Sequence, residues 1–340
     1  RRKGWILLGA PIAALAFVFI PVAQSVLAVA VFLLITNFGM ALFRSPTISW
    51  LGDLFQPNER SKANGVINLM GGVGGLLAYF AGGWLFDNLG RSAPFIAGSI
   101  AMLVALVVAL IFVKEPRDNQ VGGQHAGTAE TKGVISNLKT VFNNPDKSGI
   151  YVLIGILFWF MAFNALETAL SSFAVFTLGM KPGAASIYAG LVTVSFIIFS
   201  IPAGLLGSKI GRRNTILIGL TGLAPLLLLG YLFIQGTITF IVVLVAAGAL
   251  WALVNVNSLP LVYDYGDERK IGAYTGLYYF SSQTAAILGP TLAGSLVDAL
   301  GDQYRWVWLF SMVFMALAWL AMSRVKAKQP SMTVVQAAGN

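Results

Sequence analysis

Long apolar runs follow one another along most of the chain, separated by short polar stretches. Ten of these runs have about the 20 residues that a helix needs to cross the hydrocarbon core of a bilayer. They cover roughly residues 5–22, 25–44, 64–86, 93–113, 150–172, 184–207, 214–234, 237–260, 272–297 and 305–323. Strands of a membrane barrel would be about 10 residues long and would alternate apolar with polar positions. The pattern therefore predicts an all-α membrane protein with ten transmembrane helices in this chain.

The composition strengthens this prediction. Of the 340 residues, 57% are hydrophobic and 10% are charged, and the mean hydropathy is +0.79. A soluble domain carries about 25% charged residues. The chain has no cysteine, which excludes disulfides, and its one histidine, His125, falls in a polar stretch. We therefore expect no enzyme, no metal site and no cofactor.

The net charge of +9 does not indicate a nucleic-acid partner, because the basic residues alternate between loops. If the chain starts in the cytoplasm, Arg91, Lys181 and Arg305 are the basic residues that fall on the outer side. This distribution follows the positive-inside rule. We expect both ends of the chain to be cytoplasmic, with the lipid bilayer as the surrounding partner.

A weak internal repeat divides the chain into two halves. At an offset of 211 residues, several charged and glycine positions match in one register. The matches pair Arg1 with Arg212, Arg2 with Arg213, Asp53 with Asp264, Gly65 with Gly276, Gly83 with Gly294, Asp87 with Asp298 and Gly90 with Gly301. Parallel repeats of this kind are typical of secondary transporters.

The two halves differ in their number of apolar runs. The second half has two runs before Arg212, whereas the first has none before Arg1. We expect about 60 preceding residues with two further helices, in a protein of twelve helices arranged as six plus six. A native ten-helix protein is the alternative. The predicted parts are an N-terminal half (1–114), a cytoplasmic linker (115–148) with a short amphipathic helix at 133–142, a C-terminal half (149–326) and a cytoplasmic tail (327–340).

The segment GLLGSKIGRR, from Gly204 to Arg213, resembles the loop signature G-x-x-x-D-R/K-x-G-R-R/K of the major facilitator superfamily, with Ser208 in place of the Asp. Three further stretches are similar to the bacterial sugar:cation symporter-like branch, which includes sucrose and maltose proton symporters and the glycoside-pentoside-hexuronide group. They are ALFRSPTISWLGDLFQPNERSKANGVINLMGGVGG from Ala41, FWFMAFNALETALSSF from Phe158 and WALVNVNSLPLVYD from Trp251. The resemblance implies the major facilitator fold in two pseudo-symmetric halves, in a bacterial inner membrane.

One helix face in the second half is polar. Phe160, Asn164, Glu167 and Ser171 recur at spacings of four, three and four residues. An ionised carboxylate inside a membrane is costly, so it is retained where it has a function or a partner. We interpret Asn164 and Glu167 as substrate or coupling residues; a static hydrogen bond or ion pair to another helix is the alternative.

Arg44 lies near the end of its apolar run, on the face of Asn37 and Ala41. The resemblance implies a role in substrate binding or coupling. A guanidinium can hold sugar hydroxyls or a carboxylate such as Glu167. Snorkelling of the side chain toward the interface is the alternative.

Amides also interrupt the run that ends at Asp264. Asn255 and Asn257 lie within it, and Pro260 removes the hydrogen bond to the carbonyl of Val256. A wet central cavity and its ligand would satisfy such groups, whereas interhelical hydrogen bonding is the alternative, favoured more for Asn257.

Two further candidates lie on matching helices of the halves. Tyr278 belongs to a stripe with Tyr274, Ser281 and Ser282, and Asn68 to a stripe with Asn64 and two glycines. A tyrosine can stack on a sugar ring and donate its hydroxyl, but aromatic stripes also serve packing.

The charged helix ends suggest gates. Asp53 and Asp264 lie at matching cytoplasmic positions, and we expect each to pair with its loop arginine, Arg1 in the first half and Arg212 in the second. Arg2 and Arg213 follow these arginines in the loop signature. The glycines of the signature, Gly204 and Gly211, allow the tight turn between the helices. Solvated charges are the alternative.

These features predict a secondary transporter, acting as a monomer, which moves a small polar solute by alternating access. The resemblance and Glu167 favour import of a sugar with protons; sodium is the other ion considered. Antiport efflux of an amphipathic solute and a non-transporting sensor with the same fold are the alternatives. No G-x-x-x-x-G-K-[ST] sequence is present, which argues against a phosphate-binding loop for ATP.

Overall fold

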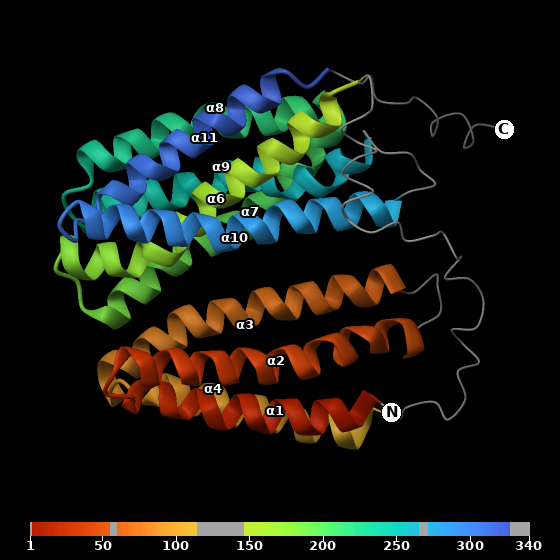
Figure 1. Cartoon of the computed structure of the whole chain (residues 1–340), viewed down its shortest axis with the longest axis vertical. Helices are drawn as coiled ribbons and strands as arrows, with labels where there is room; N and C mark the ends of the chain where they lie inside the picture. Colours follow the sequence, from red (N-terminus) through yellow and green to blue (C-terminus); the bar gives the residue numbers. More distant parts are fainter. Residues whose placement is uncertain (1, 55–59, 114–145, 265–270, 327–340) are drawn as a thin grey trace. The chain divides into compact units, whose positions relative to one another are not determined.

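The computed structural model describes residues 2–54, 60–113, 146–264 and 271–326. In these ranges the chain forms ten α-helices and no strand, which confirms the all-α prediction (Figure 1). In chain order the helices are α1 (Arg2–Phe19), α2 (Val26–Leu54), α3 (Arg60–Leu89), α4 (Ala93–Phe112), α6 (Ser148–Ser172), α7 (Pro182–Ile210), α8 (Arg212–Phe233), α9 (Thr237–Asp264), α10 (Ile271–Ala299) and α11 (Trp306–Ser323). A 3-10 turn (Ile20–Val22) follows α1 and a π-helical turn (Phe173–Thr177) follows α6.

Matching glycines end matching helices of the repeat. Gly90 follows α3 with a φ of 95°, and Gly301 follows shortly after α10 with a φ of 76°. Such angles are costly for residues with a Cβ atom, so glycine is the residue that ends a helix this way. These two sequence matches thus have the same backbone conformation.

The helices form two compact units. The first contains α1 to α4 and the start of α7 (Lys181–Ile187), and the second contains α6, the rest of α7 and α8 to α11. The boundary between the units therefore falls inside α7. The predicted amphipathic helix at 133–142 and the tail lie outside the described residues, and the predicted domain boundaries stay a prediction.

In the first unit, α1 is the central helix and packs against α2 and α4. A methyl group at Gly9 would lie 2.6 Å from the carbonyl oxygen of Gly39, so α1 and α2 are in backbone contact where they cross. Ser99 of α4 donates a hydrogen bond of 2.8 Å to the carbonyl of Ala14. Small residues and hydroxyl-to-carbonyl bonds are the usual means by which helices associate in a membrane.

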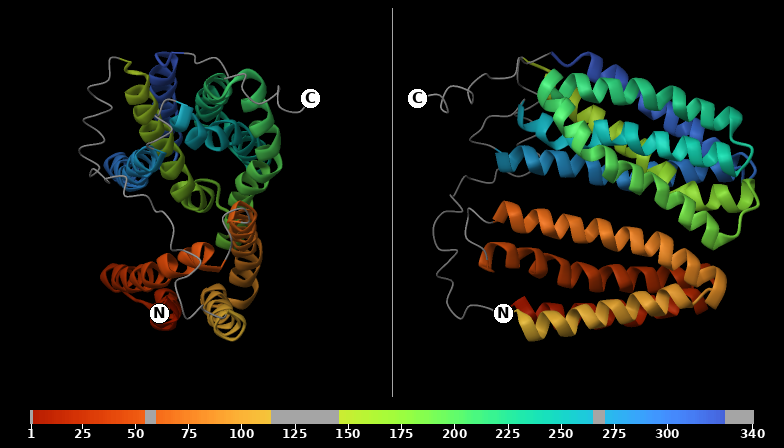
Figure 2. Two further views of the ribbon diagram at one scale, coloured as in Figure 1. Left: turned by 90° about the vertical axis from the view of Figure 1, so that its right-hand side faces the viewer. Right: turned by 180° about the vertical axis from the view of Figure 1, so that it is seen from behind.

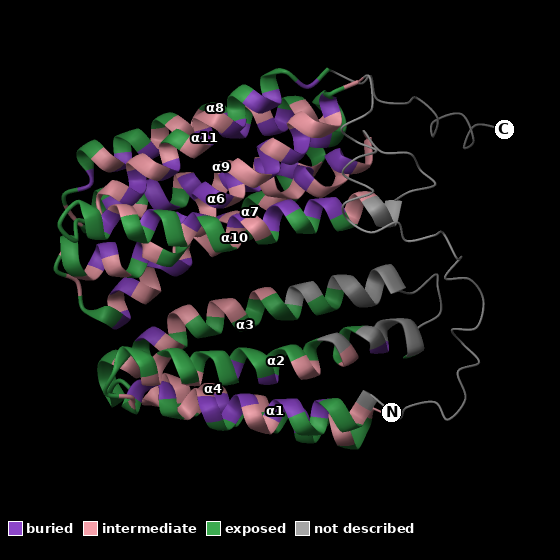
Figure 3. Ribbon diagram, in the orientation of Figure 1, coloured by how far each residue is buried: buried purple, intermediate pink, exposed green. Residues whose placement is uncertain are grey.

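The outer faces of this unit are apolar. Only 11% of the most apolar window of α2, and 11% of that of α4, is buried. Large side chains such as Leu34 and Phe38 are exposed on α2, as Figure 3 shows for the helix as a whole. An exposed apolar surface of this size is expected where lipid is the solvent.

In the second unit, α6 packs against α10 and α11, while α8 packs against α9 and α11. Two further views show these helices running side by side (Figure 2). Ser311 of α11 donates to the carbonyl of Ala162 in α6 at 2.9 Å, and Ser195 of α7 donates to that of Val245 in α9 at 2.6 Å. The same hydroxyl-to-carbonyl contact therefore recurs in both units.

Eight of the described helices are long and apolar enough to cross a membrane. Within the described ranges, α3 and α10 are not among the eight, because glycines and polar residues interrupt their apolar runs. The ten predicted helices are confirmed, and the crossing of the membrane by α3 and α10 stays a prediction.

Candidate functional site

The polar face predicted on α6 exists. Asn164 is half-buried and donates a hydrogen bond of 2.6 Å to the carbonyl of Phe160, one turn earlier. Glu167 lies on the same face and is exposed. Two turns, about 10 Å along the axis, separate Phe160 from Glu167. The face therefore presents an aromatic ring, an amide and a carboxylate in sequence.

An aromatic cluster joins this face to α9 and α10. The indole of Trp251 stacks on the ring of Phe163 with centroids 4.1 Å apart and an interplanar angle of 4°. Phe160 meets Trp251 edge-on at 5.6 Å and Tyr278 edge-on at 6.1 Å. Trp251 is only 3% exposed. The indole thus holds the two phenylalanines of α6 in fixed positions rather than offering a free stacking surface.

Beside this cluster, Tyr278 reaches α9 through a hydroxyl relay. Its Oη lies 3.2 Å from Oγ of Ser258, and Ser258 in turn donates to the carbonyl of Asn255 at 2.8 Å. Because the serine uses its proton on that carbonyl, Tyr278 is the donor to Ser258. The main-chain carbonyl of Asn255 is therefore occupied. The side-chain amide of Asn255 is half-buried and forms no hydrogen bond with any described residue.

Asn257 is in a different environment. It is 3% exposed and donates 3.1 Å to the carbonyl of Ala203 in α7 and 3.0 Å to that of Leu253 in its own helix. Gly207 makes room for it, since a methyl group there would overlap with the amide oxygen. This geometry is the interhelical contact weighed as the alternative, and a substrate role for Asn257 stays a prediction.

The loop between α7 and α8 forms a second candidate site. Gly211 has a φ of 87° and separates the two helices, and Gly204 lies against Val256 of α9. Ser208, which stands where the loop signature has an aspartate, donates to the carbonyl of Leu205 at 2.8 Å and stays within its own helix.

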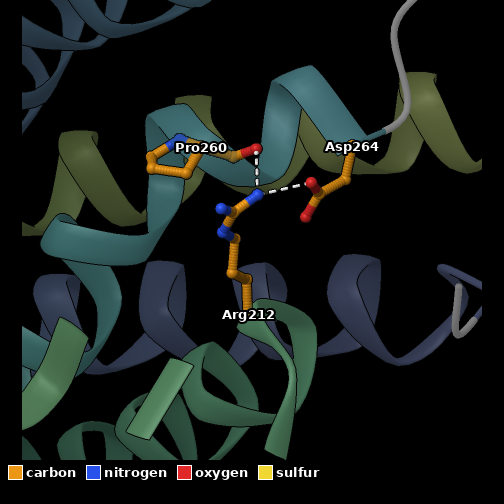
Figure 4. Close-up of polar contacts among 3 residues, drawn as sticks. All are labelled: Arg212, Pro260 and Asp264. Atoms are coloured by element: carbon orange, nitrogen blue, oxygen red, sulfur yellow. Dashed lines mark hydrogen bonds and ion pairs between the residues drawn. The ribbon is translucent and has the colours of Figure 1, made fainter. Parts of the chain in front are cut away.

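The two arginines of the loop have separate partners. Arg212 forms an ion pair with Asp264 and donates 3.2 Å to the carbonyl of Pro260 (Figure 4). Arg213 donates to the carbonyls of Val325 at 2.6 Å and Ser323 at 3.1 Å, at the end of α11. Arg212 thus links the start of α8 to the end of α9. Arg213 donates hydrogen bonds to carbonyls at the end of α11 that have no partner within that helix. The predicted pairing of Asp264 with a loop arginine is present; its gating role stays a prediction.

Most of the candidate site residues in the first half have side chains that the structure does not describe. Arg1 lies outside the described residues, as do the side chains of Arg2, Asp53 and Asn68. Arg44 is exposed on α2 and forms no hydrogen bond or ion pair with a described residue. A charged side chain in a helix of this apolarity is unusual, and the substrate or coupling role of Arg44 stays a prediction.

The sequence did not indicate the contacts of three residues that are well defined in the structure. Phe163 could have been found from its spacing of three residues from Phe160. Arg305 donates 2.8 Å to each of the carbonyls of Tyr231 and Ile234 at the end of α8. Asp87 caps the start of α7, a contact between residues 96 positions apart, although its match with Asp298 in the repeat marked it as constrained.

A comparison with known protein families finds a match over nearly the whole chain. The family model described as Major Facilitator Superfamily matches residues 1–195 and 175–337. The chain belongs to the Major Facilitator Superfamily. This confirms the resemblance seen in the loop signature, and because the family is one of transporters, it also confirms that the chain is not an enzyme.

Among curated relatives, this major facilitator chain is 26% identical over 224 residues to the cis,cis-muconate transport protein of Acinetobacter baylyi, covering 65% of this chain and 54% of that protein. It is 24% identical over 263 residues to the hexuronate transporter of Bacillus subtilis, covering 73% of this chain and 61% of that protein. The chain thus spans between half and two thirds of the length of these relatives.

Among solved structures, the fold is similar to that of a bacterial homolog of the human lysosomal transporter Spinster in an inward-facing and unoccupied conformation. The TM-score is 0.74 with 16% sequence identity, over 96% of this chain and 84% of that one. Similarity at this identity shows the fold alone, and it confirms the major facilitator architecture.

Proposed function

We propose that this chain is part of a secondary transporter that imports a sugar, specifically a carboxylated sugar, together with protons by alternating access. The observation that carries the proposal is the side-chain amide of half-buried Asn255, which has no partner among the described residues and lies beside the hydroxyl relay and the aromatic cluster. An amide without a partner in an apolar setting is costly unless a ligand or water completes its hydrogen bonds.

The chemistry of this site suits a polyol. Asn255 offers both a donor and an acceptor, and Tyr278 retains acceptor capacity after donating to Ser258. Phe160 supplies an apolar ring beside them. Sugar rings present hydroxyls at their edges and C–H groups on their faces, so they need this combination of amide, hydroxyl and aromatic surfaces.

The carboxylate in the proposed substrate is supported from two directions. Hexuronate and muconate, named for the two relatives, both carry carboxylates. In this chain, Arg44 is a cation within the apolar helix α2, and it has no hydrogen-bond or ion-pair partner among the described residues. A guanidinium can bind a carboxylate with two parallel hydrogen bonds, so we propose Arg44, considered by itself, as a carboxylate-binding residue.

Glu167 is the proposed coupling residue. It lies in the apolar span from Ser148 to Thr177, on the face that carries the aromatic cluster. A carboxyl group carries a charge in one protonation state and none in the other, so binding and release of a proton change the energy of a helix in apolar surroundings. We further propose that the protein is a monomer of the bacterial inner membrane, with both ends of this chain in the cytoplasm.

Uptake into vesicles containing the full-length protein tests the proposal. We expect labelled hexuronate to accumulate under an imposed proton gradient, and Glu167→Gln to abolish accumulation while retaining exchange of labelled for unlabelled solute. Asp302→Asn, the same chemical change in the loop after α10, should behave as the unmodified protein. Accumulation under a sodium gradient alone would reject the proton as the coupling ion. Absence of hexuronate and of neutral sugar uptake under either gradient would reject import and favour efflux or a sensor.

A further inference from the structure

Two arginines lie where the start of α8 meets the end of α11. Arg213, the second residue of α8, donates 2.6 Å to the carbonyl of Val325 and 3.1 Å to that of Ser323. It donates a third hydrogen bond, of 3.2 Å, to the side-chain oxygen of Asn214. Arg324 lies between the two residues whose carbonyls accept from Arg213, and it is exposed. Two positive charges are therefore held at the same helix ends.

These contacts do not cancel the charge of Arg213. Its three acceptors are neutral oxygens, and they use three of the five N–H groups of a guanidinium, so two remain for another acceptor. Asp146, the acid beside these helix ends, accepts hydrogen bonds of 3.0 and 2.7 Å from the backbone and hydroxyl of Ser148. Lys326, whose backbone N–H donates 3.1 Å to that hydroxyl, adds a third cation. Positive charge is thus in excess among the described residues at this place.

Further into the helices, the seam between α8 and α11 is exposed. The indole N–H of Trp319 in α11 donates 2.9 Å to the hydroxyl of Thr221 in α8, and both residues are exposed. Leu320 lies one turn before Arg324 on the same helix face and is 51% exposed. Both helices are long and apolar enough to cross a membrane, so this surface faces lipid. About 7.5 Å along the axis separates Trp319 from Arg324, which suits the depth where tryptophan is enriched at membrane interfaces.

We propose that the α8–α11 seam, defined by Arg213, Thr221, Trp319 and Arg324, binds an anionic phospholipid. The guanidinium groups receive the phosphate, for which their fork of donors is well suited, and the exposed apolar surface around Trp319 receives the acyl chains. A zwitterionic headgroup carries its own cation, which the excess of positive charge disfavours. Basic residues at the ends of membrane helices attract anionic lipids in this way.

The bound lipid should stabilise the second unit, because it contacts two of its helices and binds the folded state alone. This site belongs to α8 and α11 and does not depend on which solute the protein moves. Failure of the proposed transport function therefore leaves the lipid site standing, and the reverse also holds.

Lipid binding to the full-length protein in detergent tests the site. Native mass spectrometry counts the phospholipids retained while phosphatidylglycerol is titrated in, with phosphatidylcholine as the zwitterionic probe. We expect phosphatidylglycerol to bind more tightly. Arg324→Gln should weaken its binding about fivefold, the effect of removing one cation near an anionic headgroup. Arg324→Lys keeps the charge and should bind within twofold of the unmodified protein. Lys209→Gln removes an exposed cation at the end of α7, outside the seam, and should leave binding unchanged.

Two further arms make the result decisive. Arg213→Gln should also weaken phosphatidylglycerol binding; if this variant does not fold, Arg324→Gln decides. Excess inorganic phosphate should not displace the lipid, because it has no acyl chains to contact the seam. Displacement by phosphate would show a site for small anions and overturn the lipid site. Equal affinity for the two lipids, or equal losses in Arg324→Gln and Lys209→Gln, would overturn it as well.

Discussion

Two asparagines in one helix illustrate how neighbouring residues acquire different tasks. Asn255 has a half-buried amide without a described partner, and Asn257 has a buried amide that bonds α9 to α7. The sequence shows that both lie in an apolar run, but it does not show which side of the helix meets α7. That depends on the rotation of α9 within its bundle, which tertiary packing determines.

The two amides therefore predict opposite outcomes on substitution. Asn255→Ala should weaken substrate binding about tenfold, because one lost hydrogen bond is worth about 1–1.5 kcal/mol, and should leave thermal stability unchanged. Asn257→Ala should lower the free energy of unfolding by about 1 kcal/mol and the apparent melting temperature by about 2–4 °C, with binding retained. Ligand titration and thermal denaturation of both variants in detergent are the measurements. The reverse assignment of effects would contradict the site.

At the scale of helices, charged side chains connect the ends of neighbouring helices. The pattern of apolar faces does not determine which helix ends are connected in this way. Arg212 bonds to α9, Arg213 to the end of α11 and Arg305 to the end of α8. The loop signature made the first two candidates recognisable from the sequence. The role of Arg305 was not recognisable, because its acceptors are main-chain carbonyls more than 70 positions away, and carbonyls leave no trace in residue identity.

The ion pair between α8 and α9 should contribute modestly to stability. Arg212 and Asp264 are 40% and 36% exposed, so water screens their attraction. A double-mutant cycle with Arg212→Ala and Asp264→Ala should give a coupling energy of about 0.2–1 kcal/mol that decreases with added salt. Thermal denaturation of the four proteins at low and high salt measures it. A coupling of zero at low salt would mean that both charges are solvated independently.

At the scale of the whole molecule, the apolar runs were sufficient to predict ten helices, since a bilayer imposes length and hydropathy on each span, whereas the family was recognised from the loop signature and the stretches that resemble it. Neither predicted the aromatic cluster or the hydrogen bonds from Asp87 to the start of α7. Phe163, Trp251 and Tyr278 come from three helices, and Asp87 meets α7 far along the chain. The repeat indicated that Asp87 was constrained but not what it bonds.

A further prediction for the whole molecule concerns whether α3 and α10 cross the membrane. These two helices carry more glycine and polar residues than the other helices. If both cross the membrane, cysteines placed at Ser92 and Gln303 should react with an impermeant maleimide on intact cells. Cysteines at Lys209 and Arg324 should react only after the membrane is permeabilised. The absence of cysteine from this chain keeps the background low. Labelling of all four positions from the same side would contradict the topology.

Proton movement on addition of solute tests the central claim most directly. Vesicles containing the full-length protein are suspended in a weakly buffered medium without an imposed gradient, and hexuronate is added while external pH is recorded. The account predicts a rise in pH that follows solute entry and disappears in Glu167→Gln, with Asp302→Asn responding normally. Entry of labelled hexuronate through the unmodified protein with no change in pH would contradict proton-coupled symport.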